Sequence, residues 1–295
     1  MGSGYKDFAP GDVLTAANVD GYLMRQTVMT FADASARNTA LSGVLDEGMV
    51  AYLEDSNIVT VYDGSAWQTT ASAAGKSYEI VKFTSSGSFS KGSYLWATTA
   101  RIRVVGGGGG SGGCLVADAS TGHVTMAGGG GGGGYAEADI ALSAMGSSET
   151  VTVGAGGAAG TTSGGGGTGV TTSFGSLVVA AGGVGGAVSE SQANLRPIGG
   201  AGGAGGAGST GDLLISGSGG YASTVYNGNT ATNSPGGASQ LSGSQTRKAT
   251  EATIAPEAGV SFGGGASGGA NQGGSASAAV GAAGAVGIVI VELFG

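Results

Sequence analysis

The sequence predicts a mainly β protein in which a short N-terminal module precedes a glycine-rich, β-sandwich-like domain. Three observations lead to this prediction: several short runs alternate apolar and polar residues, glycine becomes abundant after residue 103, and lysine and arginine become scarce at the same place. Glycine supplies 67 of the 295 residues and proline only 4. A collagen triple helix needs a strict Gly-X-Y repeat and abundant proline, so it is excluded. We expect the N-terminal module to span residues 1–75 and the glycine-rich domain residues 76–295.

The N-terminal module is expected to contain two short helices and a β-hairpin. Residues 15–26 predict the first helix, which is too short to be stable alone and which we therefore assign to an oligomer contact. Residues 33–41 predict the second helix, with Asp33 as its N-cap. Residues 48–67 alternate apolar and polar positions on either side of a turn, which predicts the hairpin. The small polar residues 69–75 predict a linker.

Further alternating runs predict the strands of the glycine-rich domain. Residues 77–83 and 100–105 are the first two, and in the second run Ile102 and Val104 share one face. Shorter apolar runs recur between the glycine stretches and are expected to complete the frame; they lie at 136–143, 149–154, 176–180, 212–216 and 287–293.

The glycine stretches predict helices of the polyglycine-II type. Residues 199–208 read GGAGGAGGAG, which has a period of three, and such a helix has three residues per turn with a rise of about 3.1 Å. It makes no internal hydrogen bonds, so every backbone group needs a partner on a neighbouring helix. Glycine removes the side chains that would hold those neighbours apart. The alternative is a flexible Gly/Ser coil.

Charge and hydropathy exclude two classes of partner. The net charge of -8 opposes binding to nucleic-acid phosphates and to anionic lipid. The longest aliphatic run, residues 288–291, is far shorter than the roughly 18 residues of a membrane span. The first residues lack the basic and apolar regions of a signal peptide, so we expect synthesis in a host cytoplasm and release by lysis.

The motifs that resemble catalytic, cofactor or metal sites have simpler explanations. Residues 151–160 resemble the strand and turn of a dinucleotide site, but the sequence TTSGGGGTG follows where a helix should begin. His123 and Cys114 are predicted to be a loop residue and a buried thiol rather than a catalytic pair. Glu137 and Asp139 alternate with apolar residues, which predicts a solvent-facing strand. We therefore expect a protein that is not an enzyme and needs no cofactor or metal.

Three polar, glycine-poor inserts interrupt the glycine pattern, at residues 114–127, 187–198 and 221–262. Aromatic faces can stack on sugar rings, and amide side chains can bond sugar hydroxyls, so the inserts are candidates for a recognition surface. The alternative is that they only connect the helices. The candidate receptor-binding residues are His123, Tyr221, Tyr226, Asn227, Asn229, Asn233 and Gln240.

Several stretches resemble minor tail and tail-fibre proteins of actinobacterial phages. Residues 8–41 together with 47–67 are similar to the N-terminal attachment module of such proteins. Residues 83–113 together with 128–157 resemble the glycine-rich tail domain, and residues 284–294 resemble its closing strand. The inserts depart from this pattern.

The resemblance implies a homotrimer in the virion that contacts other tail or baseplate proteins. By analogy with the glycine-rich adhesins of T-even-like phages, the inserts would be displayed at one end of a polyglycine-II bundle and would bind a host-surface glycan or cell-wall polymer. The alternatives are a purely structural tail or spike component, a polyglycine-II ice-binding protein, and a depolymerase. Irregular inserts oppose the flat face that ice binding requires, and the lack of an acid/base pair opposes a depolymerase.

Overall fold

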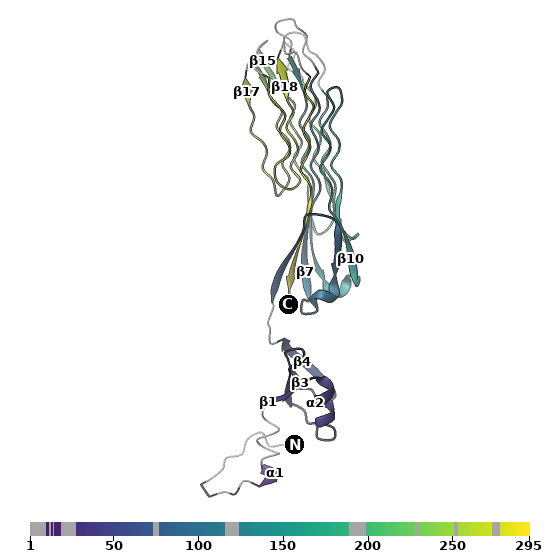
Figure 1. The fold of residues 1–295 in the computed structure, drawn as a ribbon, viewed down its shortest axis with the longest axis vertical. Coiled ribbons are helices and arrows are strands. Elements are labelled where there is room, and N and C mark those ends of the chain that lie inside the picture. Colours follow the sequence, from purple (N-terminus) through teal and green to yellow (C-terminus); the bar gives the residue numbers. More distant parts are fainter. Residues whose placement is uncertain are drawn as a thin grey trace. The chain divides into compact units, whose positions relative to one another are not determined.

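The computed structural model describes residues 10–11, 13, 15–18, 28–72, 77–115, 124–188, 199–227, 230–250, 253–272 and 278–295. Strands account for 32% of the chain and helices for 7%, which confirms the prediction of a mainly β fold. The chain divides into two compact units, Met1–Ser77 and Tyr78–Gly295. Each unit has its own sheets, which Figure 1 labels along the chain.

The first unit is built on a four-stranded sheet with the order β1-β2-β3-β4. Strands β1 and β2 are parallel, and the other two pairs are antiparallel. The pairing of β2 with β3 confirms the predicted hairpin. The elements of this unit are α1 (Ala16–Asn18), β1 (Val28–Phe31), α2 (Ala34–Ala40), β2 (Val50–Leu53), β3 (Ile58–Tyr62) and β4 (Trp67–Ser72).

Helix α2 confirms the second predicted helix and its cap. The Asp33 carboxylate accepts a hydrogen bond from the amide of Ala36 at 2.7 Å, which satisfies one of the amides that the first helical turn leaves unpaired. The predicted first helix begins in α1, but most of residues 15–26 lie outside the described residues. The linker prediction for residues 69–75 is wrong in part. Strand β4 continues to Ser72 because its backbone pairs with β3, although its small polar residues predict a linker.

Helix α2 is fixed to the sheet by one buried cation. The guanidinium of Arg37 lies 4.3 Å from the centre of the Trp67 ring and donates to Thr60 Oγ1 at 2.9 Å. Arg37 is buried, and this desolvation lowers its pKa. The aromatic face and the hydroxyl stabilise the charge in place of water.

The second unit contains two five-stranded sheets packed face to face. Their strand orders are β14-β9-β7-β19-β5 and β13-β12-β11-β10-β6. Ile102 and Val104 of β7 are fully buried with Phe174 and Val291 between the sheets, so the predicted alternation of that strand is confirmed. The strands are β5 (Tyr78–Phe83), β6 (Gly87–Ser90), β7 (Thr99–Val105), β9 (Tyr135–Ala141), β10 (Ser148–Thr152), β11 (Thr172–Phe174), β12 (Val178–Ala180), β13 (Gly208–Thr210), β14 (Leu213–Ile215) and β19 (Ile288–Phe294), with 3₁₀ turns η3 (Lys91–Tyr94) and η4 (Leu142–Ala144).

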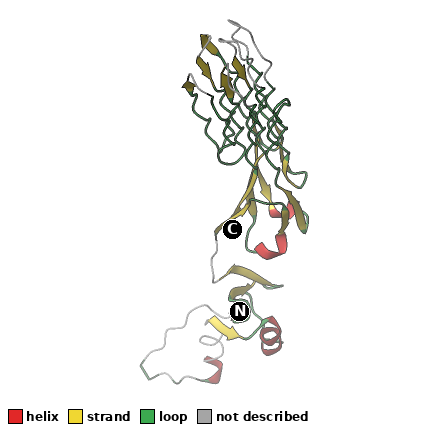
Figure 2. Cartoon of the chain, turned by 45° about the horizontal axis from the view of Figure 1, so that its top comes forward, coloured by secondary structure: helices red, strands yellow, loops and turns green. Residues whose placement is uncertain are grey.

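The strands of this sandwich continue directly into long, parallel and antiparallel glycine-rich segments, drawn mostly as loops in Figure 2. For example, residues 106–113 follow β7, and residues 128–134 precede β9. We refer to these segments as glycine helices. The others that adjoin sandwich strands are residues 154–160, 164–170, 181–187, 200–207, 216–221 and 279–287.

The hydrogen bonds of the glycine helices repeat every three residues. In residues 106–113, three successive amides donate to three different neighbours: Gly106 to Gly134 at 2.9 Å, Gly107 to Val170 at 3.0 Å, and Gly108 to Ala285 at 2.8 Å. The fourth amide, of Gly109, returns to the first neighbour at Gly131. Three residues per turn with all bonds between helices is the polyglycine-II pattern that the sequence predicts.

The same helix is surrounded by neighbours on every side. Its carbonyl oxygens accept from three further segments: Gly107 from Gly183 at 2.9 Å, Gly108 from Gly157 at 2.8 Å, and Gly109 from Ala266 at 3.0 Å. A Cβ atom on any of residues 106–110 would lie only 2.0 to 2.2 Å from a carbonyl oxygen of a neighbouring helix. Glycine is therefore required at each of these five positions.

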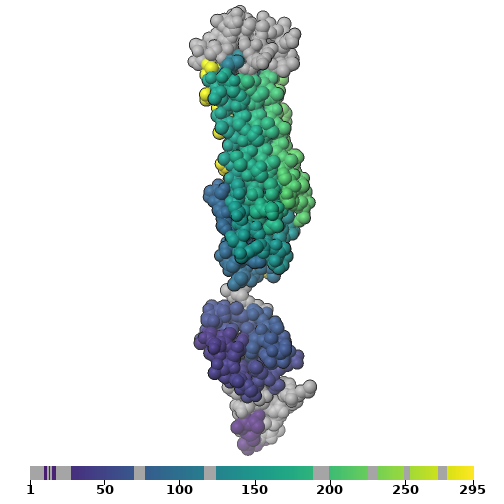
Figure 3. All heavy atoms as spheres, turned by 90° about the vertical axis from the view of Figure 1, so that its right-hand side faces the viewer, coloured from purple at the N-terminus to yellow at the C-terminus, as the bar shows by residue number. Residues whose placement is uncertain are grey.

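A helix at the surface of the bundle needs glycine at only two of the three positions in each turn. In residues 200–207, Gly203 and Gly206 are buried, whereas Ala201, Ala204 and Ala207 are exposed. In the three-residue repeat of this sequence, alanine thus occupies the one position per turn that faces solvent. Figure 3 shows one face of the bundle, coloured teal to green, as a closely packed surface.

Candidate functional site

The described ends of the first two inserts, and part of the third, lie at the end of the second unit opposite the sandwich, which we name the distal end. The insert at 114–127 joins the glycine helices that follow β7 and precede β9, at the ends remote from those strands. The insert at 187–198 joins residues 181–187 to 200–207 in the same way. The third insert, residues 221–262, begins at the distal end and runs down to the sandwich at Ser239. It returns to the distal end near Lys248 and Ile254, and then runs down again to end at Phe262 beside the sandwich. Figure 1 shows strands β15, β17 and β18 at this end.

Short strands and a small apolar cluster organise the described part of the distal end. Val124, Met126, Ile254 and Ala270 are buried together. The strands that frame the cluster are β8 (Val124–Met126) paired with β18 (Ala270–Gln272), and the sheet β15 (Val225–Asn227), β16 (Thr230–Thr232) and β17 (Ala249–Thr250). These strands and the apolar cluster lie at the distal ends of the glycine helices, so the side chains that they carry are attached to ordered structure.

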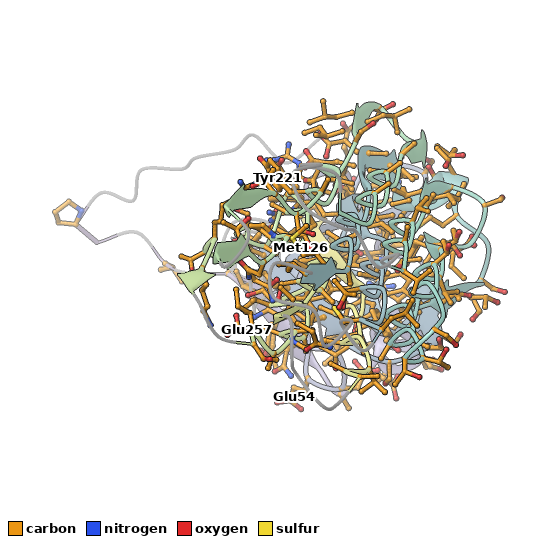
Figure 4. The ribbon with its side chains drawn as sticks, turned by 90° about the horizontal axis from the view of Figure 1, so that it is seen from above. Glu54, Met126, Tyr221 and Glu257 are labelled. Carbon is orange, nitrogen blue, oxygen red and sulfur yellow. The ribbon has the colours of Figure 1, made fainter. Side chains whose placement is uncertain are left out.

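Tyr221 is the predicted site residue that the structure places at the distal surface. It closes the glycine helix 216–221, where its carbonyl accepts from the amide of Gly129 at 3.2 Å and its amide donates to Pro235 at 3.0 Å. Its side chain is 52% exposed. The guanidinium carbon of Arg247 lies 6.0 Å from the centre of its ring. Seen from the distal end in Figure 4, Tyr221 lies nearer the periphery than Met126.

Asn233 has a structural position, which corrects its assignment to a solvent-facing recognition surface. It is 1% exposed, and its Oδ1 accepts a hydrogen bond from the amide of Lys248 at 2.6 Å. The backbone N–H of Asn233 donates to the carbonyl of Lys248 at 3.1 Å. The polar side chain of Asn233 bonds to the backbone next to Arg247. The sequence alone does not distinguish this structural role from a role in binding.

Gln240 lies away from the distal end. It is exposed on a turn next to Ser239, whose hydroxyl donates to the carbonyl of Phe262 at 2.6 Å, and Phe262 packs against Val105 and Ile288 where the helices meet the sandwich. The structure therefore does not bring Gln240 together with Tyr221. Tyr226 and Asn227 belong to strand β15, of which only the backbone is described. Asn229 and His123 lie outside the described residues.

Arg247 is the residue that the sequence interpretation missed. It donates to Thr224 Oγ1 at 3.4 Å, next to the ring of Tyr221. The sequence does single it out in one way. The only lysines and arginines after residue 103 are Arg196, Arg247 and Lys248, and all three fall within inserts. Lys248 is paired with Glu257.

The residues considered for catalysis have structural partners. Cys114 is buried, and its thiol donates to the carbonyl of Gly269 at 3.0 Å. Asp139 lies on the outer face of the sandwich, where Arg101 donates to it at 2.8 and 3.0 Å and lowers its pKa. Glu137 accepts from the hydroxyl of Tyr135 and, with burial, raises the pKa of that phenol. These pairs fit the predicted solvent-facing strand.

The described residues contain no group of three or more His, Cys, Asp or Glu side chains arranged to hold a metal ion. In the same ranges of the chain, no helix is long and apolar enough to cross a membrane.

The fold and the distal end together define a scaffold class: a β-sandwich whose strands extend into a bundle of glycine helices that carries loops at its far end. The comparison with known families agrees with this description. Residues 84–294 match the glycine-rich domain family, and the chain belongs to that family. No curated protein matches the chain.

Proposed function

We propose that this protein is a component of a phage tail, a tail-fibre or minor tail protein, that binds a polymer on the host surface through its distal end. The observation that carries the proposal is that the described ends of the inserts at 114–127 and 187–198 lie at that end, together with strands β15 and β17 of the third insert (Figure 1). The chain enters the second unit at Tyr78, which pairs with Phe294 at the ends of β5 and β19 remote from the glycine helices. We assign attachment to the first unit, which precedes this point in the chain, and recognition to the distal end of the second unit.

The glycine bundle suits the task of holding a binding surface away from an attachment point. Its amides and carbonyls are paired between helices at 2.7 to 3.2 Å over most of its length, so no helix can move alone without losing several bonds. Loops on a rigid support lose less entropy on binding than free loops do. In a homotrimer, three such ends would act together, so weak individual contacts would suffice for adsorption.

Adsorption tests this proposal. Virions carrying Tyr226→Ala together with Asn229→Ala are expected to adsorb to actinobacterial cells less than unmodified virions do, with the content of this protein checked independently. The matched control replaces the exposed pair Gln240 and Leu241 by Ala on the turn beside the sandwich, and full adsorption is expected there. If purified, assembled protein binds no host cell wall, and the distal double variant adsorbs normally, a purely structural role replaces the proposal.

Trimer formation and attachment are assigned to the first unit. Deleting residues 1–70 should abolish incorporation into virions and yield a monomer in light scattering, while the second unit, which contains its own core, stays folded. A truncated protein that is incorporated at normal copy number contradicts the assignment.

One observation favours a second candidate, an ice-binding protein. One glycine helix presents a regular surface, because its exposed alanines 201, 204 and 207 repeat every three residues. A measurable freezing hysteresis for the purified protein would support ice binding, and its absence would leave the adhesin proposal.

A further inference from the structure

We propose that the distal end recognises an anionic saccharide, with the Tyr221 ring against the sugar ring and the Arg247 guanidinium on its carboxylate or phosphate group. This inference rests on the proposed function and specifies its ligand class. It starts from the charge distribution, since cations vanish from the glycine-rich domain after Arg103 except within the inserts, in a chain of net charge -8. The inserts also carry four carboxylates, those of Asp118, Glu190, Glu251 and Glu257, so the surroundings of each cation decide whether it can bind an anion.

The two cations of the described distal end have different surroundings. Lys248 forms an ion pair with Glu257, so its charge is already balanced. Arg247 is exposed and donates to the neutral hydroxyl of Thr224 at 3.4 Å, and no carboxylate of the described ranges pairs with it. A guanidinium has five donors in a planar fork. Such a fork can bind a carboxylate or phosphate with two parallel hydrogen bonds.

Tyr221 supplies the complementary surface. Its ring is half exposed, and the guanidinium carbon of Arg247 is 6.0 Å from the ring centre, at the outer limit of direct cation–π contact. The ring face is therefore accessible beside the charge. The C–H face of a sugar packs well on such a ring, which carries negative charge on its face. An acidic sugar residue offers both features within one ring.

The backbone that carries both side chains is held in place before any ligand binds. Tyr221 is fixed by backbone bonds to Gly129 and Pro235 in the glycine lattice. The chain at Arg247 is fixed by the two hydrogen bonds between buried Asn233 and the backbone of Lys248. Asn233 is thus a positioning residue for the pair. Preorganisation of this kind lowers the entropic cost of binding.

Ligand pairs that differ only in charge test the inference on the full-length protein. The probes are oligogalacturonate against its methyl ester, and phosphomannan against the dephosphorylated polymer, with affinities measured by calorimetry at two salt concentrations. Unmodified protein is expected to prefer a charged member of at least one pair, with an affinity that falls as salt rises. The preferred pair identifies the anionic group as a carboxylate or a phosphate.

Variants separate the two contacts. Arg247→Gln should weaken binding of the charged probe about ten-fold or more and leave the neutral one unchanged, because it removes charge-assisted hydrogen bonds only. Arg247→Lys should lose part of the affinity, since it keeps the charge without the fork. Tyr221→Ala should weaken the charged and neutral probes alike. Lys82→Gln on β5, an exposed position in the sandwich, makes the same charge change as Arg247→Gln and should have no effect.

Equal affinity of the unmodified protein for charged and neutral probes, binding to none of the four, or an Arg247→Gln variant that binds as tightly as the unmodified protein would each overturn the inference. The proposed function is judged separately. If virions adsorb to cells while the protein does not distinguish charge, only this inference fails. If virions and purified protein bind no host surface, the proposed function fails as well.

Discussion

Replacing Gly203 by alanine tests the glycine lattice at one defined contact. A Cβ atom built at this position lies 2.0 Å from the carbonyl oxygen of Val184 in the neighbouring helix, whereas ordinary van der Waals contact begins at 3.4 Å. The two backbones would have to separate by about 1.4 Å. Gly219 provides the matched control, since its Cβ would meet only the carbonyl of Gly203 at 3.4 Å.

The expected cost follows from the bonds that the separation breaks. Val184 donates to Ala204 at 2.9 Å and accepts from Gly131 at 2.8 Å. Losing two hydrogen bonds at about 1 kcal/mol each, together with about 1–3 kcal/mol of overpacking, gives a destabilisation of about 3–5 kcal/mol for Gly203→Ala. Gly219→Ala adds no such clash and restricts the unfolded chain, so its stability should stay within about 1 kcal/mol of the unmodified protein.

Calorimetric unfolding of the second unit measures both variants. At roughly 2–4 °C per kcal/mol for a unit of this size, Gly203→Ala should lower Tm by about 6–20 °C, and Gly219→Ala should change it by only a few degrees. Near-equal Tm values for the two variants would refute the reasoning, because an unpacked coil tolerates a methyl group equally at both positions.

Three further predictions concern single side chains. Asp33→Ala removes the N-cap of α2 and should destabilise the first unit by about 1 kcal/mol in its denaturant unfolding; an unchanged midpoint would contradict the cap. The amides of Ala66 and Ser65 hold the pKa of Asp63 below its ordinary range, so this carboxylate stabilises the unit above the unfolded pKa of about 3.9 and stops doing so as pH falls towards its folded pKa. Asp63→Asn should therefore flatten the acid side of the stability profile, and an unaltered profile would count against those bonds. Cys114 is 1% exposed, so a thiol reagent should label it only as fast as the bundle opens; rapid labelling of folded protein would contradict its burial.

Local patterns in the sequence predict much of the fold. The alternation at residues 100–105 predicts the buried face of β7, and Asp33 marks the start of α2. The GGAGGAGGAG repeat predicts polyglycine-II helices because the period of three is a property of the helix itself. The neighbours of each helix are not predictable in this way. Gly106 and Gly107 are identical in sequence, yet they bond to residues 28 and 63 positions further along the chain.

The candidate site was less predictable, because it depends on which residues share one end of the bundle. Tyr221 and Gln240 belong to one insert, but the glycine helix at 235–239 carries the chain from the distal end to the sandwich between them. Asn233 is polar, as a binding residue would be, but its side chain is buried and bonds to the backbone next to Arg247. Arg247 is recognisable in the sequence only by the scarcity of other cations, a signal that gains meaning when the structure places it beside Tyr221.

Hydrogen–deuterium exchange of the glycine amides tests the account most directly, because both rigid display and the packing of the inserts depend on the lattice. The amides of residues 106–113 and 128–134 are donors to neighbouring helices. They are expected to exchange as slowly as those of β7 and β19, through opening of the whole unit. Exchange of these glycines at the rate of an unstructured peptide, with the sandwich still protected, would contradict the bundle and with it the proposed display of the distal end.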